Sequence, residues 1–139
     1  MTRFKFRLER LMDYRRLQEK WAKDEFVGAR RRRLDGESQV EQVKTIRTKA
    51  LDGTFPKLPD RLAHEAHLDR LDAEQGALEA AVSVLLGEEE SARDSWIETK
   101  QNLEALEKLR AKDYEEWQVV EGRREQAELD EWAVLRRAA

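Results

Sequence analysis

The chain has 139 residues, enough for one domain and seldom for two. Charged residues make up 41% of it, against roughly 25% in an ordinary globular domain, a composition typical of long helices. The sequence holds no cysteine, which excludes a disulfide framework and thiolate metal sites. No apolar run approaches the roughly 18 residues of a membrane span, and the N-terminus lacks the apolar core of a signal peptide. We therefore expect a cytoplasmic, all-α protein with no integral membrane segment.

The net charge of −3 hides an asymmetry between the two halves of the chain. Residues 1–50 hold 15 Lys and Arg against 8 Asp and Glu, a net charge of +7. Residues 51–139 hold 12 Lys and Arg against 22 Asp and Glu, a net charge of −10. Halves of opposite sign favour packing on each other.

The first half predicts one long helix, from about residue 3 to residue 50. Apolar side chains recur at heptad spacing, the pattern of a helix packed along one face. Polar side chains interrupt this line, and other apolar side chains lie beside it near the N-terminus. The line comprises Leu8, Leu11, Ala22, Ala29, Val43, Ile46 and Ala50, is interrupted by Arg15, Gln18, Glu25, Arg32 and Gln39, and is flanked by Phe4, Tyr14, Leu17, Trp21 and Phe26.

The stretch "LDGTFPKLPD", residues 51–60, contains both prolines and predicts a turn over about 51–59. Pro59 suits the first turn of a new helix, because the N–H that proline lacks would be unpaired there. We expect the second helix over about residues 60–135. Glycines inside both predicted helices, at positions 28, 36, 76, 87 and 122, indicate either close helix approach or a bend, and Gly87 is the most plausible place for a break.

The second helix carries a heptad repeat whose phase never slips, and most of its seam positions are apolar, which favours a left-handed coiled coil over disorder. After Leu106 the seam becomes more polar. The positions are Leu68, Leu71, Gln75, Leu78, Val82, Leu85, Glu89, Ala92, Trp96, Thr99, Leu103, Leu106, Arg110, Asp113, Trp117, Val120, Arg124, Ala127, Glu131 and Val134.

A short connection makes neighbouring helices antiparallel. With the turn centred near Phe55, residue i should face a residue near 110 − i, so that Leu8 meets Leu103 and Val43 meets His67. The last 30 or so residues then have no partner within the chain. We expect a single domain over residues 1–139, an α-hairpin in which the second helix is longer and projects past the first.

Signs of catalysis or cofactor binding are weak. "HEAH" places His64 and His67 at i and i+3, whereas the metalloprotease motif has histidines at i and i+4, so we expect ordinary surface residues and no metal. The chain has no phosphate-binding loop, and a coiled coil offers no concave pocket in which carboxylate pKa values would shift. We expect no cofactor and no enzymatic activity.

The run "RRRR", residues 30–33, suits either nucleic acid or an acidic surface. Four successive arginines wrap all round a helix, so one of them, Arg32 by the predicted phase, should face the seam. No aromatic residues interleave with the run as they would in a stacking platform. We favour pairing with acidic residues of the second helix and no nucleic acid; those expected opposite are Asp69, Asp72, Glu74 and Glu79.

Three segments resemble the FliJ family, the small soluble components of the bacterial flagellar type III export apparatus. The start, "FKFRLERLMDYRRLQEKWA", is similar to the family's Phe-x-Phe-x-Leu opening. The middle, "SWIETKQNLEALEKLRAKDYEEW", is similar to its stretch around a Trp and a Leu-Glu-Lys-Leu core, and the end, "RREQAELDEWA", to its Glu-Gln-x-x-x-Asp-Glu close. Spacing and length agree over essentially the whole chain.

The resemblance implies a non-enzymatic coupling subunit. Its implied partners are the hexameric export ATPase, whose ring pore the coiled coil would enter, the cytoplasmic domain of the export gate, and export chaperones. It would thus lie in the cytoplasm, peripherally associated with the inner membrane. A self-associating coiled-coil chaperone or adaptor, or the equivalent stalk protein of a virulence type III system, remains an alternative.

The resemblance also implies two contact regions. Candidate ATPase-binding residues are Phe4, Phe6, Leu8, Arg10 and Leu11 from the start, and Trp117, Val120, Arg123, Arg124, Gln126, Asp130 and Glu131 from the end. Candidate gate-binding residues are Val43, Ile46, Arg47, His67 and Leu71.

Overall fold

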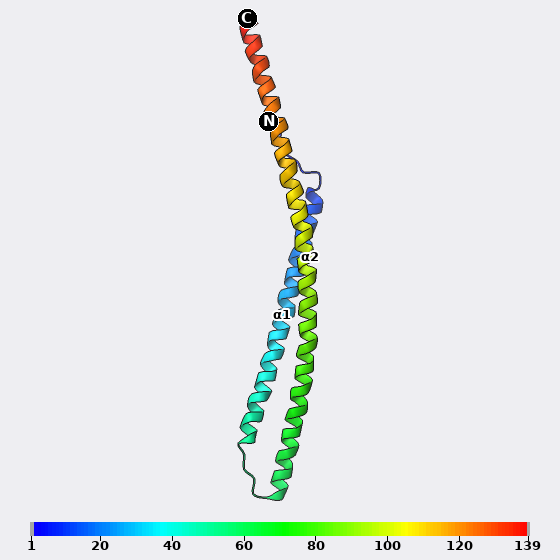
Figure 1. Ribbon diagram of the computed structural model, residues 1–139, viewed down its shortest axis with the longest axis vertical. Coiled ribbons are helices and arrows are strands. Elements are labelled where there is room, and N and C mark those ends of the chain that lie inside the picture. Colours follow the sequence, from blue (N-terminus) through cyan, green and yellow to red (C-terminus); the bar gives the residue numbers. More distant parts are fainter. Residues whose placement is uncertain (1, 139) are drawn as a thin grey trace. The chain divides into compact units, whose positions relative to one another are not determined.

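A computed structural model describes residues 2–138 as two helices, α1 (Glu9–Leu51) and α2 (Leu58–Ala138), joined by Asp52–Lys57 (Figure 1). The described residues include no strand. The all-α prediction, with a longer second helix, is confirmed. The chain divides into two compact units, one of residues 21–96 and one that combines the N-terminal residues up to 20 with those from 97 onward, and each is described by itself. The single domain expected over residues 1–139 stays a prediction.

In the unit of residues 21–96, the two helices run antiparallel on either side of the connection. The connection lies along the first turns of α2, because the Phe55 ring packs on His64 with centroids 4.6 Å apart. Arg61 holds it there by donating hydrogen bonds to the carbonyl oxygens of Phe55 and Pro56, at 2.9 and 3.0 Å. The predicted turn is therefore present, as an extended strip rather than a tight reversal.

The extended connection corrects the predicted register. Arg33 pairs with Glu89 and Arg47 with Asp72, so the residue numbers of a pair add up to about 120 rather than 110. Six extended residues reach about 20 Å, as far as roughly 13 helical residues at 1.5 Å each. The first turns of α2 therefore lie against the connection, and every later residue of α1 meets a partner about ten positions further along α2 than expected.

The predicted phase of α1 was half right. Every second seam position was placed one residue too early: Leu11 and Ile46 are 40% and 50% exposed, whereas Met12 is buried. Of the polar residues predicted to interrupt the seam, Glu25, Arg32 and Gln39 are exposed and lie outside it, whereas Arg15 and Gln18 are half-buried. The buried apolar positions of α1 are Met12, Phe26, Ala29, Val40 and Val43.

The predicted phase of α2 is confirmed. Each predicted seam position from Leu68 to Trp117 is buried or half-buried, and each from Val120 onward is exposed. The helix continues through Gly87 without a break. Close helix approach explains one glycine, since a Cβ on Gly36 would lie 3.1 Å from the Leu85 and Val82 side chains, while one on Gly87 would meet nothing within 4 Å.

These two glycines give a matched prediction. Gly87→Ala should raise the free energy of unfolding by about 1 kcal/mol, because alanine favours helix and has open space there. Gly36→Ala should gain less than half of that, because Leu85 and Val82 must move aside. Urea unfolding followed by circular dichroism measures both, and an equal gain would show that the helices do not approach closely at Gly36.

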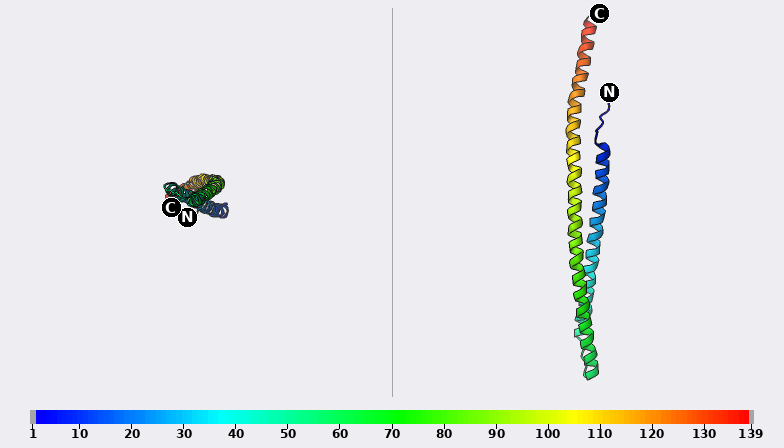
Figure 2. Two further views of the ribbon diagram at one scale, coloured as in Figure 1. Left: turned by 90° about the horizontal axis from the view of Figure 1, so that it is seen from below. Right: turned by 90° about the vertical axis from the view of Figure 1, so that its right-hand side faces the viewer.

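In the unit that contains both termini, α1 begins at Glu9, not near Arg3 as predicted. Residues 2–8, which we call the strap, lie alongside α2 (Figure 2). Residues 2–6 form no regular secondary structure, and residues 7–8 form a turn that leads into α1. In an extended chain Phe4 and Phe6 share one face, whereas on a helix they would point about 200° apart. Phe6 is buried and Phe4 packs on Tyr114, so the extended form covers more apolar surface.

The uncovered end of the second helix is shorter than expected. The Thr2 hydroxyl donates to the Glu121 carboxylate, whereas every described residue from Gly122 to Ala138 is exposed. These 17 residues of α2, which we call the C-terminal extension, span about 25 Å. Trp117, predicted to be uncovered, is half-buried beside Phe4.

Candidate functional site

The C-terminal extension presents large apolar side chains to solvent. Trp132 is 67% exposed and Leu135 is 63% exposed, and with Arg136 they line a shallow pocket of about 350 Å³. Leu129 and Val134 are exposed to a similar degree. A single exposed apolar side chain is ordinary, but several on one unpaired helix end are a feature that protein interaction surfaces share.

Most of the predicted C-terminal contact residues lie on or just before this extension. They are all exposed, and they are Val120, Arg123, Arg124, Gln126, Asp130 and Glu131. Their polar groups pair locally: Gln126 donates a hydrogen bond to Asp130 at 3.1 Å, and Arg124 lies 3.7 Å from Glu121. Local pairs on an exposed helix are weak, so the charges stay available to a partner.

The predicted N-terminal contact residues separate into two groups. Phe4, Phe6 and Leu8 point inward, whereas Arg10 and Leu11 are exposed. Phe4 is the centre of an aromatic cluster: its ring centroid lies 5.2 Å from that of Tyr114 and 5.8 Å from that of Trp117. The inward residues thus fix the strap on α2, and they offer little surface to a partner.

Charged groups strengthen the attachment of the strap. The Arg110 guanidinium lies 5.5 Å from the Phe4 ring centroid and 3.2 Å from the Glu9 carboxylate. At the other end, the hydrogen bond from Thr2 is the main cause that lowers the pKa of Glu121 below its ordinary value of about 4.5. Both ends of the strap therefore carry polar contacts that flank the aromatic cluster.

The lowered pKa of Glu121 predicts how its hydrogen bond with Thr2, at the start of the strap, responds to pH. The Thr2 contact stabilises the folded state above the ordinary pKa of Glu121, and this contribution is lost as the pH falls through the lowered value. Thr2→Val should move the pKa of Glu121 back toward 4.5, measured by NMR titration of the labelled carboxyl carbon. Thr54→Val, a change at an exposed threonine of the connection, serves as the control and should leave the pKa of Glu121 as it is in the natural chain.

The predicted gate-binding residues also separate by exposure. Val43 and Leu71 are buried between the helices, and Arg47 pairs with Asp72. Ile46 and His67 are exposed. Only these last two present side chains to a partner without a change in helix packing.

An ion pair lies between the two helices in the unit of residues 21–96. Glu89, only 6% exposed, accepts hydrogen bonds from Arg33, which also donates to Glu37 at 2.9 Å. These bonds, first the one to Glu89 and then that to Glu37, raise the pKa of Arg33 above its ordinary value. The expectation that Arg32 faces the seam was wrong, because the seam of α1 passes through Arg33 instead. The residues expected opposite, at positions 69–79, were wrong because of the register, which brings Glu89 to Arg33. Arg32 instead pairs with Glu25, at 3.5 Å.

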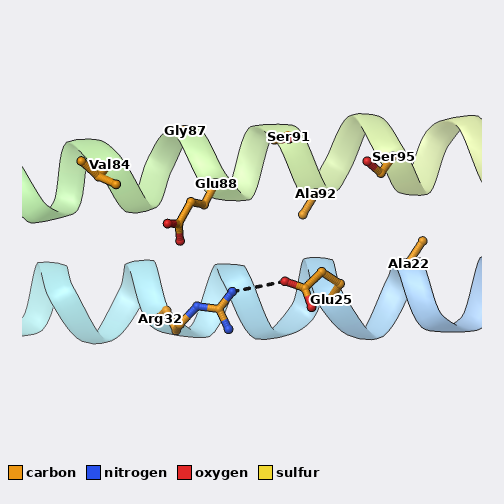
Figure 3. Close-up of a pocket in the computed structure, with 9 residues that line it drawn as sticks. All are labelled: Ala22, Glu25, Arg32, Val84, Gly87, Glu88, Ser91, Ala92 and Ser95. Atoms are coloured by element: carbon orange, nitrogen blue, oxygen red, sulfur yellow. Dashed lines mark hydrogen bonds and ion pairs between the residues drawn. The ribbon is translucent and has the colours of Figure 1, made fainter.

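A groove of about 550 Å³ lies between the helices of the same unit (Figure 3). Ala22 and the Glu25–Arg32 pair line it on α1, opposite small side chains of α2 such as Ser91, Ala92 and Ser95. It is open to solvent. Within residues 2–138, no group of three or more His, Cys, Asp or Glu could hold a metal, and neither helix has a stretch able to cross a membrane.

Sequence reasoning missed two aromatic contacts. Phe26 stacks on Trp96 with ring centroids 5.4 Å apart, and the Arg93 guanidinium lies 5.5 Å from the Phe26 ring. Tyr114 packs under Phe4. The correct register would have found both, since Phe26 and Trp96 then lie opposite each other. Leu129 and Leu135, the exposed neighbours of Trp132, lie outside the heptad seam and gave no signal of their own.

A comparison with protein-family models finds one described as "Flagellar FliJ protein", which matches residues 4–138. Neither the curated proteins nor the solved structures include a match.

Proposed function

Because the chain belongs to the FliJ family of flagellar proteins, which serve flagellar export without being enzymes, we propose that it is a coupling subunit of the export ATPase. The observation that carries the proposal is the C-terminal extension. It is a helix end whose apolar side chains, Trp132 and Leu135 foremost, have no cover among the described residues. A hollow ring of ATPase subunits provides a cover that surrounds a helix on all sides.

The structure supports a division of roles among the proposed contact residues. Val120, Arg123, Arg124, Gln126, Asp130 and Glu131 are exposed and would contact the ATPase, together with Arg10 and Leu11 of α1. Aromatic side chains anchor protein interfaces most strongly, so Trp132 would contribute the largest share. Phe4, Phe6, Leu8 and Trp117 would act indirectly, by holding the strap against α2.

The turn end of the hairpin would contact the export gate. Ile46 and His67 are the exposed members of the proposed set and would make the contact directly. Val43, Leu71 and Arg47 would hold the helix pair beneath them, since two are buried and the third is ion-paired. Escort of export chaperones and peripheral association with the inner membrane complete the proposal and rest on the family alone.

The test is to add the full chain to the purified export ATPase and measure the rate of ATP hydrolysis. The proposal expects a higher rate and a chain that is monomeric by light scattering before the ATPase is added. If the chain binds but leaves the rate unchanged, it is not a coupling subunit. A dimer whose population rises with concentration would favour the self-associating adaptor, because a second copy would then cover the C-terminal extension.

A further inference from the structure

The strap has two edges of opposite character. In "RFKFRL", residues 3–8, successive side chains alternate between exposed and covered; residues 3–6 lie outside any helix, and residues 7–8 form the turn into α1. Phe4, Phe6 and Leu8 lie on the inner side toward α2, and Arg3, Lys5 and Arg7 are exposed on the outer side. We propose that this outer edge is a docking site for an extended, acidic segment of a partner protein.

The first support is that the cations of the outer edge have no internal partner. Among the described residues, none of Arg3, Lys5 and Arg7 forms an ion pair, and the same is true of Arg10 at the start of α1. Other arginines of α1 do have carboxylate partners, for example Arg33 with Glu89. The strap therefore presents a row of positive charge that the chain leaves uncompensated.

The second support is a hollow beside the row. A cavity of about 480 Å³ is lined by the strap and the start of α1 together with Arg110. Phe4 and Phe6 line it together with the arginines and Lys5. The one carboxylate in the lining, Glu9, already pairs with Arg110 at 3.2 Å. A partner segment that alternates acidic with apolar side chains matches this lining, because its carboxylates would meet the cations and its apolar side chains the half-buried Phe4 ring.

The third support is the backbone of the strap. In the part of the chain that the structure describes, the peptide groups of residues 3–5 form no hydrogen bond. Backbone bonds reach the strap only at its end next to α1, from the Glu9 N–H to the Phe6 carbonyl and from the Met12 N–H to the Leu8 carbonyl. An extended strand with free peptide groups can pair with a second extended chain. The strap is also held in place at Thr2 and at Phe4, so a partner would not have to order it first.

The residues around the strap favour a single acidic segment as its ligand, rather than a broad anionic surface such as a bilayer. The neighbouring part of α2, residues 104–121, holds six Asp and Glu against three Lys and Arg. A bilayer or a nucleic-acid duplex would meet these carboxylates as well as the strap, and like charges in contact repel. A single extended segment can touch the strap alone. This site requires no contact with the C-terminal extension and no ATPase, so it goes beyond the proposed function.

The test uses the full chain and a fluorescent peptide that alternates glutamate with leucine. Binding is followed by fluorescence anisotropy at about 0.15 M salt, where long-range attraction is screened. The variant R3E/K5E/R7E should bind at least tenfold more weakly than the natural chain. The matched control K23E/R30E/R31E makes the same change of charge at exposed, unpaired cations of α1 in the other unit and should bind as the natural chain does.

Three results would overturn the proposal. One is an equal loss in both variants, which would mean that net charge alone attracts the peptide. Another is the absence of binding by the natural chain. The third is tighter binding to vesicles with anionic lipid or to duplex DNA, lost in the strap variant, which would assign the edge to those surfaces. The three replaced side chains are exposed and unpaired, so the thermal midpoint of the strap variant should match that of the control.

Discussion

A chain that ends at Glu121 should fold as the full chain does and should no longer raise the hydrolysis rate of the export ATPase. All the described residues that the truncation removes, 122–138, are exposed, because burial on α2 stops at Glu121. It leaves the strap contacts and the aromatic cluster intact. The midpoint of thermal unfolding should therefore stay unchanged, while the chain no longer stimulates ATP hydrolysis. This combination of results separates a lost contact with the ATPase from a lost fold.

A finer substitution tests the same surface. Trp132→Ala with Leu135→Ala should weaken binding to the ATPase by at least tenfold, since truncating a single aromatic anchor commonly costs about 2 kcal/mol. Leu58→Ala with Leu62→Ala is the matched control, because it removes two exposed leucines from the other end of α2. If the control weakens binding as much, or if the truncated chain still stimulates hydrolysis, the contact lies elsewhere.

The largest effect on stability is expected at Glu89. Glu89→Ala removes the partner of Arg33 from the seam and should lower the free energy of unfolding by about 2–3 kcal/mol, because a charge inside a helix pair is costly without its counterion. The cost stays below that of a fully buried pair, because Glu37 still accepts a hydrogen bond from Arg33. Urea unfolding of the full chain measures the change.

Two further variants show that the charge, not the lost volume, is responsible. Replacing both partners, Arg33→Leu with Glu89→Leu, should restore most of the stability, since apolar side chains of similar size often replace a buried ion pair without loss. Glu90→Ala, one position further along and exposed, should change little. A double variant as unstable as Glu89→Ala would show that packing dominates at this position.

The features of the fold that rest on the heptad repeat could be predicted from the sequence. The features that depend on the conformation of one short segment could not. The heptad spacing of α2 fixed its seam as far as Trp117, because many side chains agree on one phase. On α1 the choice between Leu11 and Met12 depends on a neighbouring pair of apolar residues, and periodicity alone does not decide it. The register depended on whether Asp52–Lys57 turns tightly or extends, which proline and glycine content does not reveal.

The candidate site, too, could be predicted only in part. An uncovered C-terminal end could be predicted, because α2 is longer than α1 in any register. Its starting point could not, since that depends on the register and on the strap. The non-helical form of residues 2–8 could not be predicted in this way, because the apolar and basic residues of "FKFRLER" also suit the first turns of a helix. The alternation of apolar and basic side chains over residues 3–7 has the period of an extended chain and is the signal that favours the observed form.

The exposure of the C-terminal extension on all sides has a consequence for the helix itself. An isolated helix of about this length is only marginally stable in water, and packing provides most of the stability of helices in proteins. Protection of backbone amides against hydrogen exchange should therefore be highest near Leu71 and Glu89, where α2 is buried, and should fall to almost none beyond Gly122. Part of the binding energy of any partner at this end must then go into ordering the helix, so its affinity will fall as the temperature rises.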